Sequence, residues 1–158
     1  MKSHSKLVMD VSQLNEFLVD IFPQVKDEFK VESLTLNEMR TRMFVGEQHL
    51  RPGDTVSGPA MFGLADVSIY LLTIARIGPK ALAVTTNISM DFMRKPQYGR
   101  DLIAKSRLLK LGRSLSIGDV LIFSDEIAEP VARASMTYSI PPFGSKSDIN
   151  FIRQNNLK

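Results

Sequence analysis

The chain of 158 residues contains no cysteine and only two histidines, His4 and His49. The absence of cysteine excludes disulfide bonds, thiolate metal sites and a cysteine nucleophile. Two histidines cannot build a histidine-rich metal site, and a Ser-His-Asp triad would have to recruit His49. We therefore expect a protein without a metal site, whose chemistry depends on other side chains.

The sequence also lacks targeting and membrane signals. The first ten residues contain no apolar segment typical of a signal peptide. The longest apolar run, residues 56–77, is interrupted by Asp66 and Arg76, which argues against a membrane span. A net charge of +3 is too mild to indicate a nucleic-acid partner. We expect one cytoplasmic domain, with residues 1–9 as a flexible arm and residues 143–158 as a polar C-terminal tail.

The segment from residue 55 to residue 79 predicts one long helix with defined ends. Ser57 or Gly58 can cap its start, and Pro59 suits the first turn, where its missing N–H would have had no partner. Gly78, which a proline follows, is a stop signal. The residues between are apolar almost all round, so we expect this helix to be buried in a core or wrapped by a sheet.

A single acid, Asp66, stands in the middle of this helix. A carboxylate with apolar neighbours on both sides is costly unless it is paired or its position is useful. One interpretation gives the helix a single wet face, on which Asp66 joins Ser68, Thr73 and Arg76. The other interpretation is a catalytic carboxylate in an apolar cleft.

The chain before the central helix predicts smaller elements. Asp10 is followed by a glutamine at the spacing of a capping box, so residues 11–21 should form a short amphipathic helix. Residues 29–45 read as two short strands or one bent strand, in which Arg40 and Arg42 share a face. A loop rich in turn residues then leads into the central helix.

The chain after the central helix is almost entirely β-structure. Four strands are predicted, at residues 82–92, 101–111, 115–123 and 131–140. In the first of them Thr85 and Asn87 lie two residues apart, so we expect them on one face. Consecutive strands with short connections should form an antiparallel meander, whose buried face can hold one apolar helix. The sequence therefore predicts an α+β protein of the hotdog fold, in which a curved antiparallel β-sheet wraps one long central helix, with a short N-terminal helix.

Several motifs occur in the order that a known family shows. The central helix begins with Ser57, Gly58 and Pro59, and Asp66 follows nine residues after Ser57. Three further segments belong to the pattern: Phe92 to Pro96, Leu111 to Arg113, and Val131 to Tyr138. From residue 51 to residue 141 the sequence resembles the hotdog-fold acyl-CoA thioesterases, in particular the PaaI-like branch.

The resemblance implies roles for three residues. The family begins its central helix with His-Gly-Gly, and the first glycine, Gly58 here, supplies the backbone N–H that polarises the thioester carbonyl. Asp66 is then the general base or the nucleophile, and Thr85 orients the attacking water or the carboxylate. Ser57 replaces the family's histidine and Pro59 its second glycine, and these departures bear on the rate and the substrate more than on the fold.

The spacing of Gly58 and Asp66 predicts an assembly. Eight residues of helix separate them, which is about 12 Å along the axis, so one carbonyl cannot contact both in one chain. If both act, the site needs two subunits, and we expect a homo-oligomer that is at least a dimer. By resemblance, a homotetramer built from two dimers is a further expectation.

The remaining candidate residues are those that would hold the substrate. Tyr70 lies one turn after Asp66, within reach of its carboxylate, and His49 lies in the loop before the helix. The other candidates for substrate binding are Ser57, Asn87, Arg94, Lys95 and Arg113. The three basic residues among them stand at a strand end and a turn, where they could meet the phosphates of coenzyme A. Coenzyme A is part of the substrate, and no separate cofactor is expected.

Two functions of different classes remain open on the sequence alone. The first is hydrolysis of the thioester of a small or medium acyl-CoA. The second is a non-catalytic hotdog module that binds acyl-CoA or a related ligand, which the replacement of the family's His-Gly-Gly favours. A hydratase is less favoured, because no pairing of an acid with a histidine follows the start of the central helix. The acyl chain, the carrier (coenzyme A or acyl carrier protein) and the choice between base and nucleophile for Asp66 also remain open.

Overall fold

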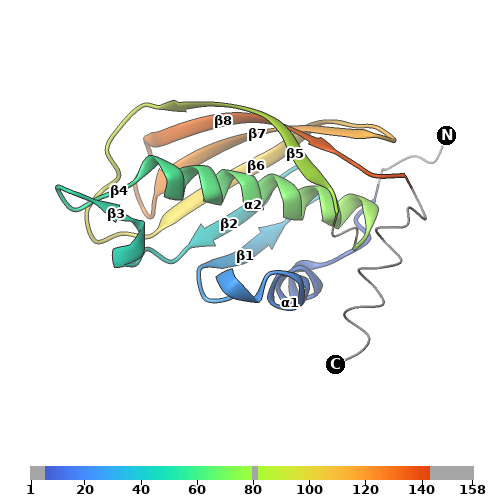
Figure 1. Cartoon of the computed structure of the whole chain (residues 1–158), viewed down its shortest axis with the longest axis horizontal. Coiled ribbons are helices and arrows are strands. Elements are labelled where there is room, and N and C mark those ends of the chain that lie inside the picture. The colour runs from blue at the N-terminus through green and yellow to red at the C-terminus, as the bar shows by residue number, and fades with distance from the viewer. Residues whose placement is uncertain (1–5, 80–81, 143–158) are drawn as a thin grey trace.

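The computed structural model describes residues 6–79 and 82–142 of the chain (Figure 1). Its α-helices are α1 (Val11–Ile21) and α2 (Gly58–Ile77), and single 3₁₀ turns occupy Pro23–Val25 and Glu47–His49. Its strands are β1 (Phe29–Leu34), β2 (Met39–Met43), β3 (Leu50–Arg51), β4 (Thr55–Val56), β5 (Val84–Phe92), β6 (Leu102–Leu111), β7 (Leu115–Ser124) and β8 (Pro130–Ser139). The expected tail, residues 143–158, and the first five residues of the expected arm lie outside the described residues.

One antiparallel sheet of six strands wraps α2, as the hotdog prediction requires (Figure 1). Its strand order is β1-β2-β6-β7-β8-β5, while β3 and β4 form a separate hairpin. The expected meander of four consecutive strands is confirmed for β6, β7 and β8 but is wrong for β5, which pairs with β8 and not with β6. The connection between β5 and β6, residues 93–101, is too long for a tight hairpin, and it carries the chain across the sheet so that β6 can pair with β2. As a result β5 is an edge strand of the sheet.

The ends of α2 confirm the start and stop signals that were predicted from the sequence. Ser57 is the N-cap, and its side chain accepts a hydrogen bond from the backbone N–H of Ala60, while Gly78 ends the helix with a positive φ of 93°. Gly118 on β7 lets the helix approach the sheet closely, since a Cβ there would lie 2.6 Å from Ile69 Cδ1. By length and composition α2 could cross a membrane, but here it is the core helix, and 61% of its most apolar 18-residue window is buried.

The N-terminal region differs in part from the expected arm. The capping box of α1 is present as predicted, with Asp10 and Gln13 bonded reciprocally. Residues 7–9, however, lie against the molecule, because the backbone N–H groups of Val8 and Met9 donate to the carbonyl of Ala75 at 2.8 and 3.3 Å. Leu7 also packs against the core, so this part of the arm is docked onto the end of α2.

The outer face of the sheet carries a network of charges at one end. Arg40 and Arg42 share that face, as predicted, and both bond to Glu32. Arg42 also reaches Asp101 at 3.1 Å and Asp125 at 2.7 Å. The hydrogen bond from Arg42 lowers the pKa of the Asp125 carboxyl, against a smaller opposing effect of burial. Burial raises the pKa of Glu32, but the hydrogen bonds and charges of the two arginines outweigh it, and the net shift is downward.

Candidate functional site

An irregularity in β5 decides which of its side chains face α2. The register pairs Thr85 with Tyr138, then shifts at a β-bulge, and pairs Asn87 with Thr137. Thr85 therefore shares the buried face of Tyr138, whereas Asn87 points to the outer face and is exposed. The expectation that Thr85 and Asn87 share a face is wrong, because Thr86 is inserted between them without a partner on β8.

Asp66 is a half-buried carboxylate whose Oδ1 is held by two hydroxyl groups. Thr85 Oγ1 donates to Asp66 Oδ1 at 2.5 Å, and the hydroxyl of Tyr138 lies 2.5 Å from the same oxygen. The Tyr138 hydroxyl is also 2.7 Å from the backbone carbonyl of Asp66, so its one proton serves two acceptors. Within the described part of the chain, Asp66 Oδ2 accepts no hydrogen bond. One oxygen thus fixes the carboxylate, and the other is left to accept a proton or to attack.

Tyr138 is a candidate site residue that was not predicted from the sequence. Along β8 it follows Ala132, Ala134 and Met136 at every second position on the buried face, so the sequence pattern indicates an ordinary core residue. Burial, and then the negative charge of Asp66, raise the pKa of Tyr138 well above its ordinary value, so it remains a proton donor at neutral pH. Tyr70 was expected within reach of Asp66. Its ring packs between those of Phe17 and Tyr138 in tilted arrangements, with both centroid distances at 6.2 Å. Burial raises the pKa of Tyr70 to about 12.

At the start of α2 a single backbone donor is left over. Pro59 has no N–H, the N–H of Ala60 donates to Ser57 Oγ at 3.3 Å, and that of Met61 donates to the Ser57 carbonyl at 3.2 Å. The N–H of Gly58 has no hydrogen-bond partner among residues 6–79 and 82–142. Since the helix dipole also places partial positive charge here, this N–H is suited to a carbonyl oxygen on which negative charge develops.

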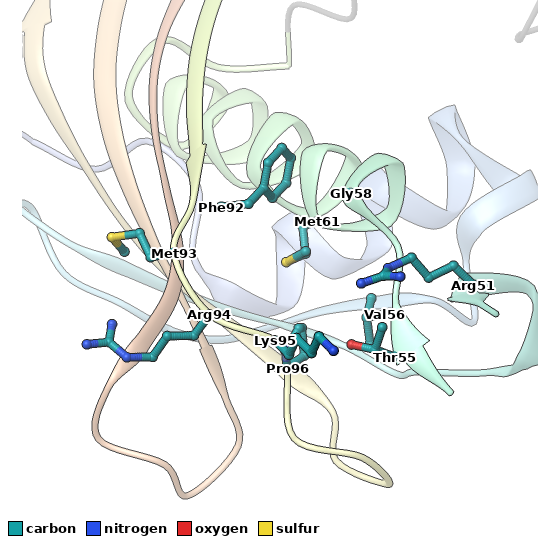
Figure 2. Close-up of a pocket in the computed structure, with 10 residues that line it drawn as sticks. All are labelled: Arg51, Thr55, Val56, Gly58, Met61, Phe92, Met93, Arg94, Lys95 and Pro96. Carbon is teal, nitrogen blue, oxygen red and sulfur yellow. The ribbon is translucent and has the colours of Figure 1, made fainter. Parts of the chain in front are cut away.

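A cleft of about 430 Å³ opens beside Gly58 (Figure 2). It is lined by Arg51, Thr55, Val56, Gly58, Met61 and residues 92–96. The ring of Phe92 lies over the start of the helix, because a Cβ on Gly58 would be only 3.2 Å from Phe92 Cζ. Figure 2 shows the side chains of Arg51 and Lys95 directed toward the cleft, with Arg94 directed away from it. Arg51 is thus a second residue that the sequence analysis missed, since its place before Pro-Gly-Asp identified it only as part of a turn.

The Asp66 cluster and the Gly58 cleft do not share lining residues. Neither Asp66 nor Thr85 lines the cleft beside Gly58. The helix from Gly58 to Ile77 is continuous, so the separation of about 12 Å along its axis holds in the folded chain. A single described chain therefore contains the two chemical parts of the predicted site, but not side by side.

Three other residues that were predicted to bind the substrate do not come together in the structure. Arg94 is exposed and donates to the carbonyl of Pro130 at 3.0 Å. Arg113 is exposed in the turn between β6 and β7, at the opposite end of the sheet from Arg94 and Lys95. His49 is buried, its Nδ1 accepts from the N–H of Gly46, and its Nε2 faces Glu28 at 3.3 Å.

The role of Ser57 as helix cap is separate from the contacts of the His49 ring. The N–H of Ser57 donates to the His49 carbonyl at 2.8 Å, so the loop before α2 is fixed to the start of the helix.

Among the residues that the structure describes, no group of three or more histidine, aspartate or glutamate side chains is arranged to hold a metal ion.

Comparison with known proteins finds one family profile and several solved structures to which the chain is similar. The profile of the "Thioesterase superfamily" matches residues 53–131, half of the chain. A "putative thioesterase" from Silicibacter sp. TM1040 is 56% identical, covers 89% of this chain and 97% of its own, and superposes with a TM-score of 0.84. A mutant of phenylacetic acid degradation protein PaaI from Thermus thermophilus is 26% identical over 75% of this chain and 99% of its own, with a TM-score of 0.65.

A third solved structure contains a ligand. It is a hypothetical thioesterase protein with coenzyme A from Streptococcus pneumoniae TIGR4, which is 19% identical to this chain. The two superpose with a TM-score of 0.68 over 82% of this chain and 97% of the other. At this level of identity the likeness is one of fold.

Proposed function

Because the chain belongs to the thioesterase superfamily, we propose that it hydrolyses acyl-CoA thioesters, with Asp66 and the Gly58 N–H as its reacting groups. The observation that carries the proposal is the Asp66 carboxylate, fixed through Oδ1 by Thr85 and Tyr138 with Oδ2 left without a partner among the described residues. A pair of partly buried hydroxyl groups that both donate to one carboxylate oxygen would orient a carboxylate that takes part in the reaction. A carboxylate on a merely wet helix face would be left to solvent.

The reaction follows from the two groups. A water molecule attacks the thioester carbonyl carbon while Asp66 Oδ2 takes its proton. Negative charge develops on the carbonyl oxygen and is stabilised by the Gly58 N–H at the helix start. The C–S bond then breaks, the sulfur leaves as a thiolate and takes up the proton, and the products are a carboxylic acid and free coenzyme A. With Asp66 as nucleophile, Oδ2 attacks the same carbon, the C–S bond breaks and the thiolate leaves, so that a mixed anhydride of Asp66 and the acyl group forms. Water then hydrolyses this anhydride, which releases the carboxylic acid, regenerates the Asp66 carboxylate and supplies the proton that the thiolate takes up.

Two subunits would bring the reacting groups together. Among the described strands, β5 pairs on one side only. Antiparallel pairing of its other edge with the same edge of a second copy would set the start of one strand beside the end of the other. Thr85, which holds Asp66, lies near the start of β5, and Phe92, which covers Gly58, is its last residue. The Gly58 cleft would therefore face Asp66 of the partner subunit, and each dimer would contain two sites.

Exposed apolar side chains support this pairing. The edge strand and the residue after it expose Val84, Phe92 and Met93, which is unusual for an edge left in water. On α2, Phe62 is 40% exposed and lies one turn before Asp66 on the same helix stripe. A second copy that covered β5 and this stripe would bury these side chains and close the reaction off from bulk water.

The cleft has the charges that coenzyme A needs. Arg51 and Lys95 are exposed, form no ion pair with any described residue, and point toward the cleft (Figure 2). Two cations at a cleft mouth suit phosphate groups. The coenzyme A in the Streptococcus pneumoniae structure shows that a protein of this fold holds this ligand, and we propose the same carrier here.

The proposal is tested by thiol release from short, long and aromatic acyl-CoAs, with the native protein and with Asp66→Asn. We expect Asp66→Asn to lower kcat by about 10²–10⁴-fold. Asp20→Asn is the matched control, because Asp20 is an exposed helical acid remote from the site, and it should leave kcat unchanged. Absence of turnover with a Tm that still rises on adding acyl-CoA would favour the binding module, for which Ser57 and Pro59 argue.

A further inference from the structure

One buried hydroxyl in the cleft beside Gly58 has no hydrogen-bond partner among the residues that the structure describes. Thr55 on β4 is 7% exposed, and its Oγ1 makes no hydrogen bond within the described part of the chain. A buried hydroxyl without a partner costs stability, and most such groups in folded proteins are satisfied. Thr55 also lines the cleft, and Figure 2 shows its oxygen directed toward Lys95 and Pro96, on the far wall.

The position of Thr55 separates it from the reacting carbonyl. Three residues of chain lead from Thr55 to Gly58, and the first two are extended, with Ser57 at φ −71° and ψ 154°. Because the segment is extended, its span is close to the maximum of about 10 Å for three residues. The cleft therefore offers two donors at two places, the Gly58 N–H for the thioester carbonyl and the Thr55 hydroxyl farther along.

We propose that Thr55 is a specificity residue, whose hydroxyl binds an amide of the pantetheine arm that carries the acyl group. The inference rests on the proposed function. Pantetheine has two amides beyond its sulfur. If the thioester carbonyl binds at the Gly58 N–H, the pantetheine arm places one of these amides beside the Thr55 hydroxyl. The contact is made equally in the ground state and the transition state, so it lowers KM and leaves kcat unchanged. It also gives the orphaned hydroxyl its partner.

The test compares Thr55→Val with a matched control, Thr41→Val. Thr41 on β2 is fully buried and its Oγ1 is also unpartnered among the described residues, but it does not line the cleft. Each change replaces an unpaired hydroxyl by a methyl group of the same shape, so neither should lower Tm in the free protein. Each variant is assayed with one acyl group on three thiols: coenzyme A, pantetheine and ethanethiol, which has no amide.

We expect Thr55→Val to raise KM about tenfold for the coenzyme A and pantetheine thioesters, with kcat unchanged and no change for the ethanethiol thioester. Thr55→Ser should restore most of the affinity, and Thr41→Val should change none of these values. An equal KM for Thr55→Val and the native protein would overturn the inference, as would a loss shared by the ethanethiol thioester. The pantetheine arm can belong to coenzyme A or to acyl carrier protein, so thioesters of both are compared. A lower KM for the acyl carrier protein thioester than for acyl-CoA identifies the protein as the carrier.

The outcome also separates this inference from the proposed function. If the native protein binds coenzyme A without hydrolysing any thioester, the hydrolase proposal fails, and Thr55 is then tested by the Kd for coenzyme A. A Kd that rises about tenfold in Thr55→Val alone supports the inference. An unchanged Kd, or no binding of coenzyme A to the native protein, contradicts it.

Discussion

The two polar regions along α2 are built in opposite ways. Around Asp66 the acceptor oxygen is crowded, with the hydroxyls of Thr85 and Tyr138 both at 2.5 Å. Around Gly58 the hydrogen-bond donors have no acceptor, since neither the Gly58 N–H nor Thr55 Oγ1 has a partner among the described residues. A general base or nucleophile requires a carboxylate held in one orientation. A bound carbonyl group requires hydrogen-bond donors that are not already in use. Under the proposed function, these two regions are the two halves of one site, and each half is incomplete alone.

The largest effect should come from preventing the halves from meeting. Phe62→Glu places a charge on the exposed stripe of α2 one turn from Asp66, and we expect dissociation to monomers with a loss of kcat of about 100-fold or more. Sedimentation velocity and thiol release measure the two effects on one sample. Leu121→Glu is the control, because Leu121 is exposed to the same degree, 42% against 40%, but lies on the outer face of β7. A monomeric Phe62→Glu protein with native kcat would mean that one chain suffices.

A smaller effect should follow from loosening the carboxylate. Thr85→Val removes one donor to Asp66 Oδ1, and we expect kcat to fall about 10- to 100-fold while KM changes little, since a misplaced base affects the transition state. Thr86→Val is the matched control on the same bulge, because Thr86 is exposed and, among the described residues, its hydroxyl donates only to the Thr137 carbonyl, at 3.3 Å. Equal kcat values for Thr85→Val and the native protein would remove Thr85 from the mechanism.

The smallest effect should be on stability, from a change in the charge network of Arg42 on the outer face of the sheet, away from both Asp66 and Gly58. The folded pKa values of Glu32 and Asp125 lie below their unfolded values of about 4, so their stabilising effect is present above that pH and is lost as pH falls through the folded values. Arg42→Met should lower Tm at pH 7 by about 5 °C, which corresponds to roughly 1–2 kcal/mol. The difference in Tm should shrink between about pH 5 and pH 3. A difference that is constant with pH would show that the arginine acts through packing alone.

Local signals in the sequence predicted the helices well, because caps and stops depend on neighbouring residues. Ser57 and Gly78 bound α2 as expected, and Asp10 begins α1. The pairing of β5 was predicted wrongly, since the neighbour of a strand depends on the whole sheet and not on its own alternation. The bulge at Thr86 is likewise a property of the pair of strands, so it reversed the face of Asn87 without any sign in the sequence.

Only those residues of the candidate site that have a local signal could be named from the sequence. Asp66, Gly58 and Thr85 have unusual local settings or stand in a recognisable motif. Tyr138 looks like an ordinary buried strand residue, and only the folded sheet brings its hydroxyl to Asp66, 72 positions away. Thr55 was overlooked because the absence of a hydrogen-bond partner cannot be read from residue order.

The central claim is that Gly58 of one subunit acts with Asp66 of another, and mixing two inactive variants tests it most directly. Asp66→Asn lacks the base, and Gly58→Val crowds Phe92 and covers the N–H at the helix start. Each variant alone should be nearly inactive. After co-expression, about half of the dimers contain one of each, and one of their two sites is intact, so we predict recovery of about a quarter of native activity. Activity that stays at the level of the separate variants would contradict a site shared between subunits.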